Sequence, residues 1–207
     1  MEIQCNGFTV SFPYDIDDKY DQFEMQSKGY LSTMDEDYND LEIPELERTG
    51  PYIPSLYIVN SRDVLLVEPT KNFIQNSDIR GIKRYVKTLK KHIVEIEWKD
   101  WSFDTEPRFY PESGEPEDYI LEGKHDKQLA KRMPEVFLLD VEEKCNLKKT
   151  NNRNIIGDYC DIVIEGEPNL DIFTPTNMLY VVVSDRFKNT IEQTNVNSVV
   201  FFEIKIA

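Results

Sequence analysis

The chain is short of the residues on which recognisable enzyme chemistry depends. Its 207 residues include three cysteines, two histidines and eight glycines. Cys5, Cys145 and Cys160 are odd in number, widely separated and without a Cys-x-x-Cys pair, which indicates free thiols rather than a disulfide framework. His92 and His125 have no His, Cys or Glu at the spacing of a zinc site. We therefore expect no disulfide scaffold and no metal centre.

The glycines, serines and acids form no catalytic or ligand-binding motif. No Gly-x-Gly-x-x-Gly, P-loop or Gly-x-Ser-x-Gly sequence is present, so nothing indicates a phosphate cradle or an activated serine. Residues 35–39 imitate the start of a calcium loop, but Asp40 stands where glycine is needed and Leu46 where the last ligand is needed. We expect no cofactor, no catalytic residue and no enzyme activity.

Long apolar runs are absent as well. No window approaches the roughly 18 residues of a membrane-spanning helix, and the first twelve residues lack the basic start and apolar run of a secretory signal. We expect no membrane association. Together with the free thiols, this predicts a cytoplasmic protein.

Basic residues are the scarcer charged class, with 24 Lys and Arg against 39 Asp and Glu and a formal net charge of -15. Such a charge disfavours nucleic-acid backbones and anionic membrane surfaces as partners. It favours a basic protein partner, or it only keeps the chain soluble.

The acids gather in residues 14–47, where twelve stand against two lysines for a net charge of -10. Aromatic residues are interleaved with them, which is not typical of a disordered tail. The segment is either a solvated loop or a docking segment for a basic cleft. Our candidate partner-binding residues are its central acids and one tyrosine: Asp35, Glu36, Asp37, Tyr38, Asp40 and Glu42.

Hydrophobic patterns predict an α+β protein with mixed or antiparallel sheets and a few short helices. Strands are predicted at residues 56–59, 64–67, 93–98, 136–141 and 159–164, with an edge strand or hairpin at 2–12. Helices are predicted at residues 79–91 and 126–133. Polar residues 146–154 favour a turn. Residues 100–123 favour a long loop that divides an acidic subdomain, 1–115, from a second subdomain, 116–207, with the boundary between 100 and 135.

The predicted helix 79–91 would carry one basic face without an acid, made by its Arg and Lys residues: Arg80, Lys83, Arg84, Lys87, Lys90 and Lys91. Internal pairing of this face with the acidic segment is the preferred interpretation. Binding of an acidic partner or RNA is the alternative.

The chain ends with a clear strand–helix–strand pattern. An apolar run reaches Val183, Ser184 is a good N-cap, and Asp185 places negative charge on the first helical turn. Phe187 and Ile191, four residues apart, predict the buried side of the helix.

This closing unit resembles the C-terminal signature of a bacterial polymorphic-toxin immunity protein family, formerly a domain of unknown function. The likeness rests on residues 179–188 (LYVVVSDRFK), on Ile191 and Glu192, and on residues 199–204 (VVFFEI). It departs from the family pattern at Asn195 and Asn197, where glycine is frequent. The resemblance covers about 35 of 207 residues.

The resemblance implies a cytosolic protein without catalytic residues that binds and neutralises a cognate secreted or contact-delivered toxin domain by occlusion. The charge of -15 makes a basic nuclease one candidate toxin. Two alternatives stay open: an enzyme or nucleic-acid-processing factor whose site is made by the fold, and a structural component that assembles with copies of itself. A pocket lined with perturbed carboxylates would favour the first, and a large flat apolar surface the second.

Overall fold

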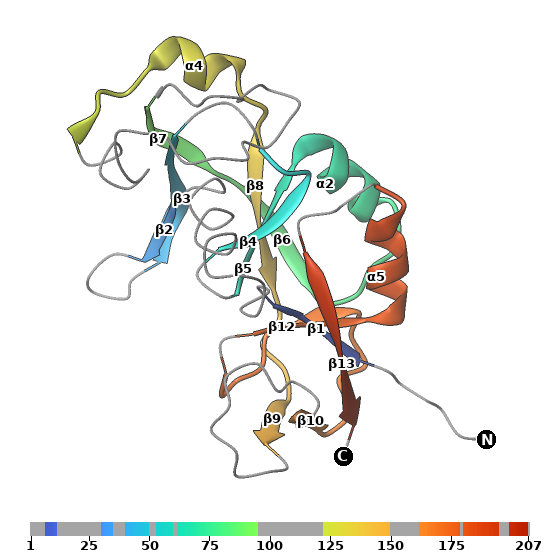
Figure 1. Ribbon diagram of the computed structural model, residues 1–207. Coiled ribbons are helices and arrows are strands. Elements are labelled where there is room, and N and C mark those ends of the chain that lie inside the picture. The colour runs from blue at the N-terminus through green and yellow to red at the C-terminus, as the bar shows by residue number, and fades with distance from the viewer. Residues whose placement is uncertain are drawn as a thin grey trace.

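The computed structural model describes residues 7–11, 30–34, 40–49, 53–59, 62–94, 122–149, 162–178, 180–194 and 199–206. Over these residues the protein is α+β, with three sheets that are mostly antiparallel and three short helices (Figure 1). The predicted fold class is confirmed.

A four-stranded antiparallel sheet has the order β4-β5-β8-β6. Its strands are β4 (Leu56–Val59), β5 (Asp63–Val67), β8 (Val136–Val141) and β6 (Ile82–Lys87). Both of its faces are buried, since Leu56 and Leu66 pack into one apolar cluster while Tyr57 and Leu65 pack into another. This is why β4 and β5 read as continuous apolar runs, and their prediction as strands is confirmed.

A three-stranded sheet has the order β2-β3-β7. Its strands are β2 (Tyr30–Met34), β3 (Asp40–Thr49) and β7 (Leu89–Val94). The β2–β3 pair is antiparallel and the β3–β7 pair is parallel. β6 and β7 are separated only by Thr88, whose N–H and hydroxyl both donate to the carbonyl of Val136. Residues 82–94 therefore supply one strand to each of two sheets.

The helix predicted at 79–91 is wrong, because this stretch forms β6 and β7. Its three- and four-residue apolar spacing imitates a helix, but Ile82 and Val86 are β-branched and suit a strand. β8 supplies the hydrogen-bonding partner for β6 from more than fifty residues away. Pairing over that distance overrides the local pattern.

A six-stranded sheet has the order β11-β12-β1-β13-β10-β9. Its strands are β11 (Ile172–Phe173), β12 (Val181–Ser184), β1 (Gly7–Ser11), β13 (Val200–Ile206), β10 (Ile162–Glu165) and β9 (Asn146–Lys149). β1 pairs antiparallel with both β12 and β13, so it lies inside the sheet. The strand predicted within residues 2–12 is present at 7–11, but its expected edge position is wrong. The turn expected at 146–154 is wrong over 146–149, where β9 pairs with β10, and residues 150–154 lie outside the described residues.

The closing strand–helix–strand unit is confirmed as β12, α5 (Asp185–Glu192) and β13. Its two strands are parallel to each other and flank β1, to which each is hydrogen-bonded. The predicted helix at 126–133 is also present as α4 (Lys127–Arg132), capped by the Asp126 carboxylate. The remaining helix, α2 (Glu68–Gln75), was not predicted; Pro69 lies in its first turn, a position that proline suits.

Three apolar clusters hold these elements together. The first joins β4, β5 and β8 to α2, β11, β12 and α5, and α2 and α5 lie side by side in Figure 1. The second joins the other face of β5 to β3, β7 and α4. The third lies on the six-stranded sheet and includes Leu147, Ile164 and Phe173.

The expected boundary between residues 100 and 135 separates strands that pair with one another. β8 follows it in sequence and lies between β5 and β6, which precede it. β1, from the N-terminal side, lies between β12 and β13. Among the described residues, no helix is long and apolar enough to cross a membrane.

Candidate functional site

Four of the six candidate partner-binding residues precede β3 in sequence, and two belong to it. Asp35, Glu36, Asp37 and Tyr38 lie outside the described residues. Asp40 and Glu42 belong to β3, where Asp40 is paired with Met34 of β2. The structure thus places two of the six candidates, Asp40 and Glu42, in β3.

The net charge of the chain is divided unevenly along the sequence. Residues 12–39 hold eight acids and two lysines, and residues 95–121 hold nine acids and two bases. These two stretches carry a net charge of -13 out of the total of -15.

The basic side chains of residues 80–91 are paired with acids. The pairs are Arg80–Asp171 at 3.3 Å, Lys83–Asp140 at 3.1 Å, Arg84–Asp140 at 2.7 Å, Lys87–Glu135 at 3.3 Å, Lys90–Glu135 at 3.8 Å and Lys91–Glu45 at 2.5 Å. The preferred interpretation, pairing with the segment 14–47, holds for Lys91 and is wrong for the other five. Their acids come from β8, its N-terminal flank and the residue before β11.

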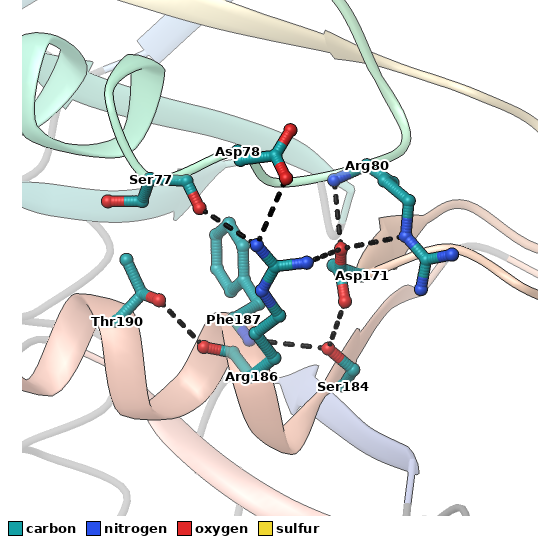
Figure 2. A network of polar contacts seen from close by, with 8 residues as sticks. All are labelled: Ser77, Asp78, Arg80, Asp171, Ser184, Arg186, Phe187 and Thr190. Atoms are coloured by element: carbon teal, nitrogen blue, oxygen red, sulfur yellow. Dashed lines mark hydrogen bonds and ion pairs between the residues drawn. The ribbon is translucent and has the colours of Figure 1, made fainter.

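Asp171 is the centre of a polar cluster between β11, β12 and the turn before β6 (Figure 2). The residue is only 3% exposed. One carboxylate oxygen accepts from the Arg80 backbone N–H at 2.9 Å and from Arg80 Nε at 3.3 Å, while the other accepts from the Ser184 hydroxyl at 3.0 Å. These contacts compensate the cost of burying a charge. We call Asp171, Arg80, Ser184 and Arg186 the Asp171 cluster.

Arg186 extends this cluster from α5 to the turn after α2. Its Nη1 lies 3.6 Å from Asp171 Oδ2, and its Nη2 donates to the Ser77 carbonyl at 3.1 Å and lies 3.5 Å from Asp78 Oδ2. Figure 2 shows the guanidinium group between these acceptors. Arg186 therefore ties the first turn of α5 to a segment more than a hundred residues earlier.

Ser184 is the N-cap of α5, as predicted. Its hydroxyl accepts from the Phe187 N–H at 3.2 Å and donates to Asp171. Phe187 and Ile191 are buried in the first apolar cluster. The sequence pattern of Val183–Phe187 therefore has a structural cause: Ser184 caps α5 and binds Asp171, and Phe187 is buried in the core.

Arg48 and Tyr57 are polar residues buried completely, at 0% exposure, in and beside the second apolar cluster. Burial raises the pKa of Tyr57 to about 12, although the nearby positive charge of Arg48 acts in the opposite direction. The phenol therefore stays neutral. Sequence reasoning missed Arg48, yet the alternation of Glu45 and Glu47 with Leu46 indicates that position 48 faces inward.

Lys90 and the two histidines bind backbone groups around α4. Lys90 Nζ donates to the carbonyls of Ala130 at 3.0 Å and Met133 at 2.8 Å, so it caps the C-terminal end of α4, and burial lowers its pKa. His92 Nε2 contacts the Gly123 carbonyl at 3.0 Å, and His125 Nδ1 accepts from the Ile93 N–H at 3.0 Å. These side chains fasten residues 122–133 to β7.

Within the part of the chain that the structure describes, no group of three or more His, Cys, Asp or Glu residues could hold a metal ion. No protein-family model matches this chain, and no curated protein matches it either. The polar groups that the fold brings together, above all the Asp171 cluster, are used in internal contacts.

Proposed function

We propose that this protein is a cytoplasmic immunity protein that binds a basic toxin domain and neutralises it by occlusion. The resemblance of the closing unit to an immunity protein family supports this proposal. The observation that carries it is the charge distribution: residues 12–39 and 95–121 together hold a net charge of -13 out of the total of -15.

This distribution suits an inhibitor whose target is basic. Charges concentrated in a few segments attract an opposite charge over about one Debye length, roughly 10 Å at 0.1 M salt. Such attraction raises association rates by roughly 10- to 1,000-fold. A toxin that acts on nucleic acid carries a basic surface because it must bind phosphates. An acidic protein that covers this surface competes directly with the substrate.

The first test is affinity capture of the tagged chain from its native cells in moderate salt, with mass spectrometry of the retained proteins. We expect one large secreted protein, bound through a basic C-terminal domain. Association of the purified pair should slow steeply as salt rises from 0.05 to 0.5 M, since steering is screened.

Two results would contradict the proposal. Recovery of the chain alone, as a stable homo-oligomer, would favour the self-assembling component. Recovery of a partner whose association rate does not depend on salt would contradict electrostatic steering, because salt screens the attraction between charged surfaces.

A further inference from the structure

Two of the most exposed large hydrophobic side chains among the described residues lie on the three-stranded sheet. Ile43 of β3 is 55% exposed and Leu89 of β7 is 52% exposed. A third, Phe73 of α2, is 37% exposed and belongs to a different part of the fold.

The register of β3 and β7 places Ile43 and Leu89 on the same face. Glu45 is paired with Leu89, and Leu46 with Lys90, in this parallel pair. Side chains two residues apart on a strand share a face, so Ile43 lies diagonally opposite Leu89. Diagonal neighbours are about 7–8 Å apart, close enough for one partner side chain to contact both.

A group of charges lies beside these two apolar side chains. Lys91 Nζ is 2.5 Å from a Glu45 oxygen and 3.8 Å from a Glu47 oxygen. The hydrogen bond and charge of Glu45 raise the pKa of Lys91, so the lysine stays protonated. Two carboxylates share one ammonium group, and the group keeps one net negative charge. We call these residues the outer face: Ile43, Glu45, Glu47, Leu89 and Lys91.

The opposite side of the same strands is fixed. Leu46 and Arg48 are fully buried, and Lys90 caps α4. The backbone of Ile93 donates to His125 and accepts from Asp126. The outer face is thus carried on a sheet whose inner side is packed, and little ordering entropy is lost when a partner binds.

We propose that the outer face is a docking surface for a basic protein partner, with Ile43 and Leu89 as its apolar anchors. This inference rests on the proposed function and names the surface that performs it. A few apolar anchors ringed by polar groups carry most of the energy of protein interfaces.

Charge complementarity selects the occupant. The carboxylate of Glu47 is the more weakly paired of the two, since it lies 3.8 Å from Lys91 Nζ while a Glu45 oxygen lies at 2.5 Å. A cationic side chain of the partner can pair with Glu47 while an apolar one contacts Ile43 and Leu89. A second copy of this chain is the wrong occupant, because each copy carries a net charge of -15 and the copies repel.

The surface can be tested with a defined probe, a short fluorescent peptide of alternating lysine and leucine. The test variant is Ile43→Thr with Leu89→Thr, which changes no charge and places β-branched threonine, a residue that suits strands, at both positions. The matched control is Phe73→Gln, which removes an exposed apolar side chain from α2. We expect the double variant to weaken peptide binding by about 10- to 100-fold and the control to leave it unchanged.

The result that would overturn the proposal is equal binding by wild type and the double variant, or an equal loss in the control. Unchanged thermal unfolding of both variants excludes a folding defect as the cause of a loss. Sedimentation of the wild-type chain tests whether a second copy binds the outer face instead. If the chain forms a concentration-dependent dimer and the double variant does not, the partner is a second copy.

Lys91→Met gives an independent readout of the partner's charge. Removing this ammonium group leaves two uncompensated carboxylates, so association with the basic peptide should become several-fold faster at low salt. A slower rate would contradict a basic partner.

If the captured protein described above binds the double variant as it binds wild type, the surface is wrong while the proposed function stands. If wild type binds the peptide but captures nothing from cells, the surface stands and the function fails.

Discussion

Asp171, just before β11, and Glu47, on β3, each lie beside basic side chains, but their surroundings differ. Asp171 is almost completely buried, and each of its oxygens accepts a hydrogen bond. Glu47 keeps a partly exposed carboxylate at 3.8 Å from a lysine that is already bound to Glu45. The first arrangement leaves nothing for a partner to bind and stabilises the fold. The second leaves both charge and apolar surface for recognition, so burial decides which of the two an acid serves.

The largest expected effect lies next to the Asp171 cluster, at Gly81. Its φ is +105°, and an added Cβ would lie 2.0 Å from the Ile172 carbonyl oxygen. Gly81→Ala should therefore lower the free energy of unfolding by about 4 kcal/mol or more, or prevent folding. Denaturant unfolding measures this loss.

Gly166 is the matched control for that substitution. Its φ is +98°, but an added Cβ would meet only the Cys145 sulfur at 3.9 Å. Gly166→Ala should cost only the strain of the left-handed conformation, about 1–2 kcal/mol. Equal losses at both glycines would show that backbone strain, and not the close approach of β11 to residue 81, sets the cost.

The second prediction concerns Asp171 itself. Asp171→Ala removes the acceptor of Ser184 and Arg80 and leaves Arg80 and Arg186 without their shared carboxylate. We expect a loss of about 2–4 kcal/mol in the free energy of unfolding, since hydrogen bonds to a buried carboxylate are lost while the arginines can still be solvated. Asp78→Asn is the control, because that carboxylate is 96% exposed and asparagine also tolerates the left-handed backbone of residue 78, where φ is 53°. This change should alter stability by less than about 0.5 kcal/mol. A loss below about 1 kcal/mol for Asp171→Ala would mean that the cluster is not a structural centre.

The third prediction uses the buried phenol. The pKa of Tyr57 is raised from 10.0 to about 12 in the folded chain. Above pH 10 the unfolded chain loses this proton first, so the contribution of Tyr57 is present below pH 10 and is lost as the pH rises through about 12. Tyr57→Phe should reduce the fall of stability between pH 10 and 12 by about 2 kcal/mol. If wild type and Tyr57→Phe lose the same amount of stability between pH 10 and 12, the prediction is contradicted and the phenol ionises freely in the folded chain.

The smallest effect on stability is expected at the outer face. Lys91→Met removes a surface ion pair with Glu45, and exposed pairs of this kind contribute little to stability. Unfolding should be almost unchanged while the association rate with a basic probe rises. A large loss of stability would place Lys91 with the Asp171 cluster as a structural residue and would erase the contrast between the two regions.

The sequence predicts features whose signals are local. The cap at Ser184 and the Phe187–Ile191 spacing lie within one turn or two of chain, and both are confirmed. The helix at 79–91 failed because its spacing is ambiguous and β8 decides the outcome from far along the chain.

The same limit applies to the site. Asp171 is one acid among 39 and is distinguished only by groups brought to it by folding. The outer face needed the β3–β7 register, since nothing in the sequence places residue 43 beside residue 89.

The most direct test of the account is growth of cells that express the toxic domain of the captured partner together with this chain. The account predicts that wild type and Phe73→Gln restore growth, while Ile43→Thr with Leu89→Thr does not, at equal protein levels. Failure of the wild-type chain to restore growth would contradict neutralisation of a toxin as its function.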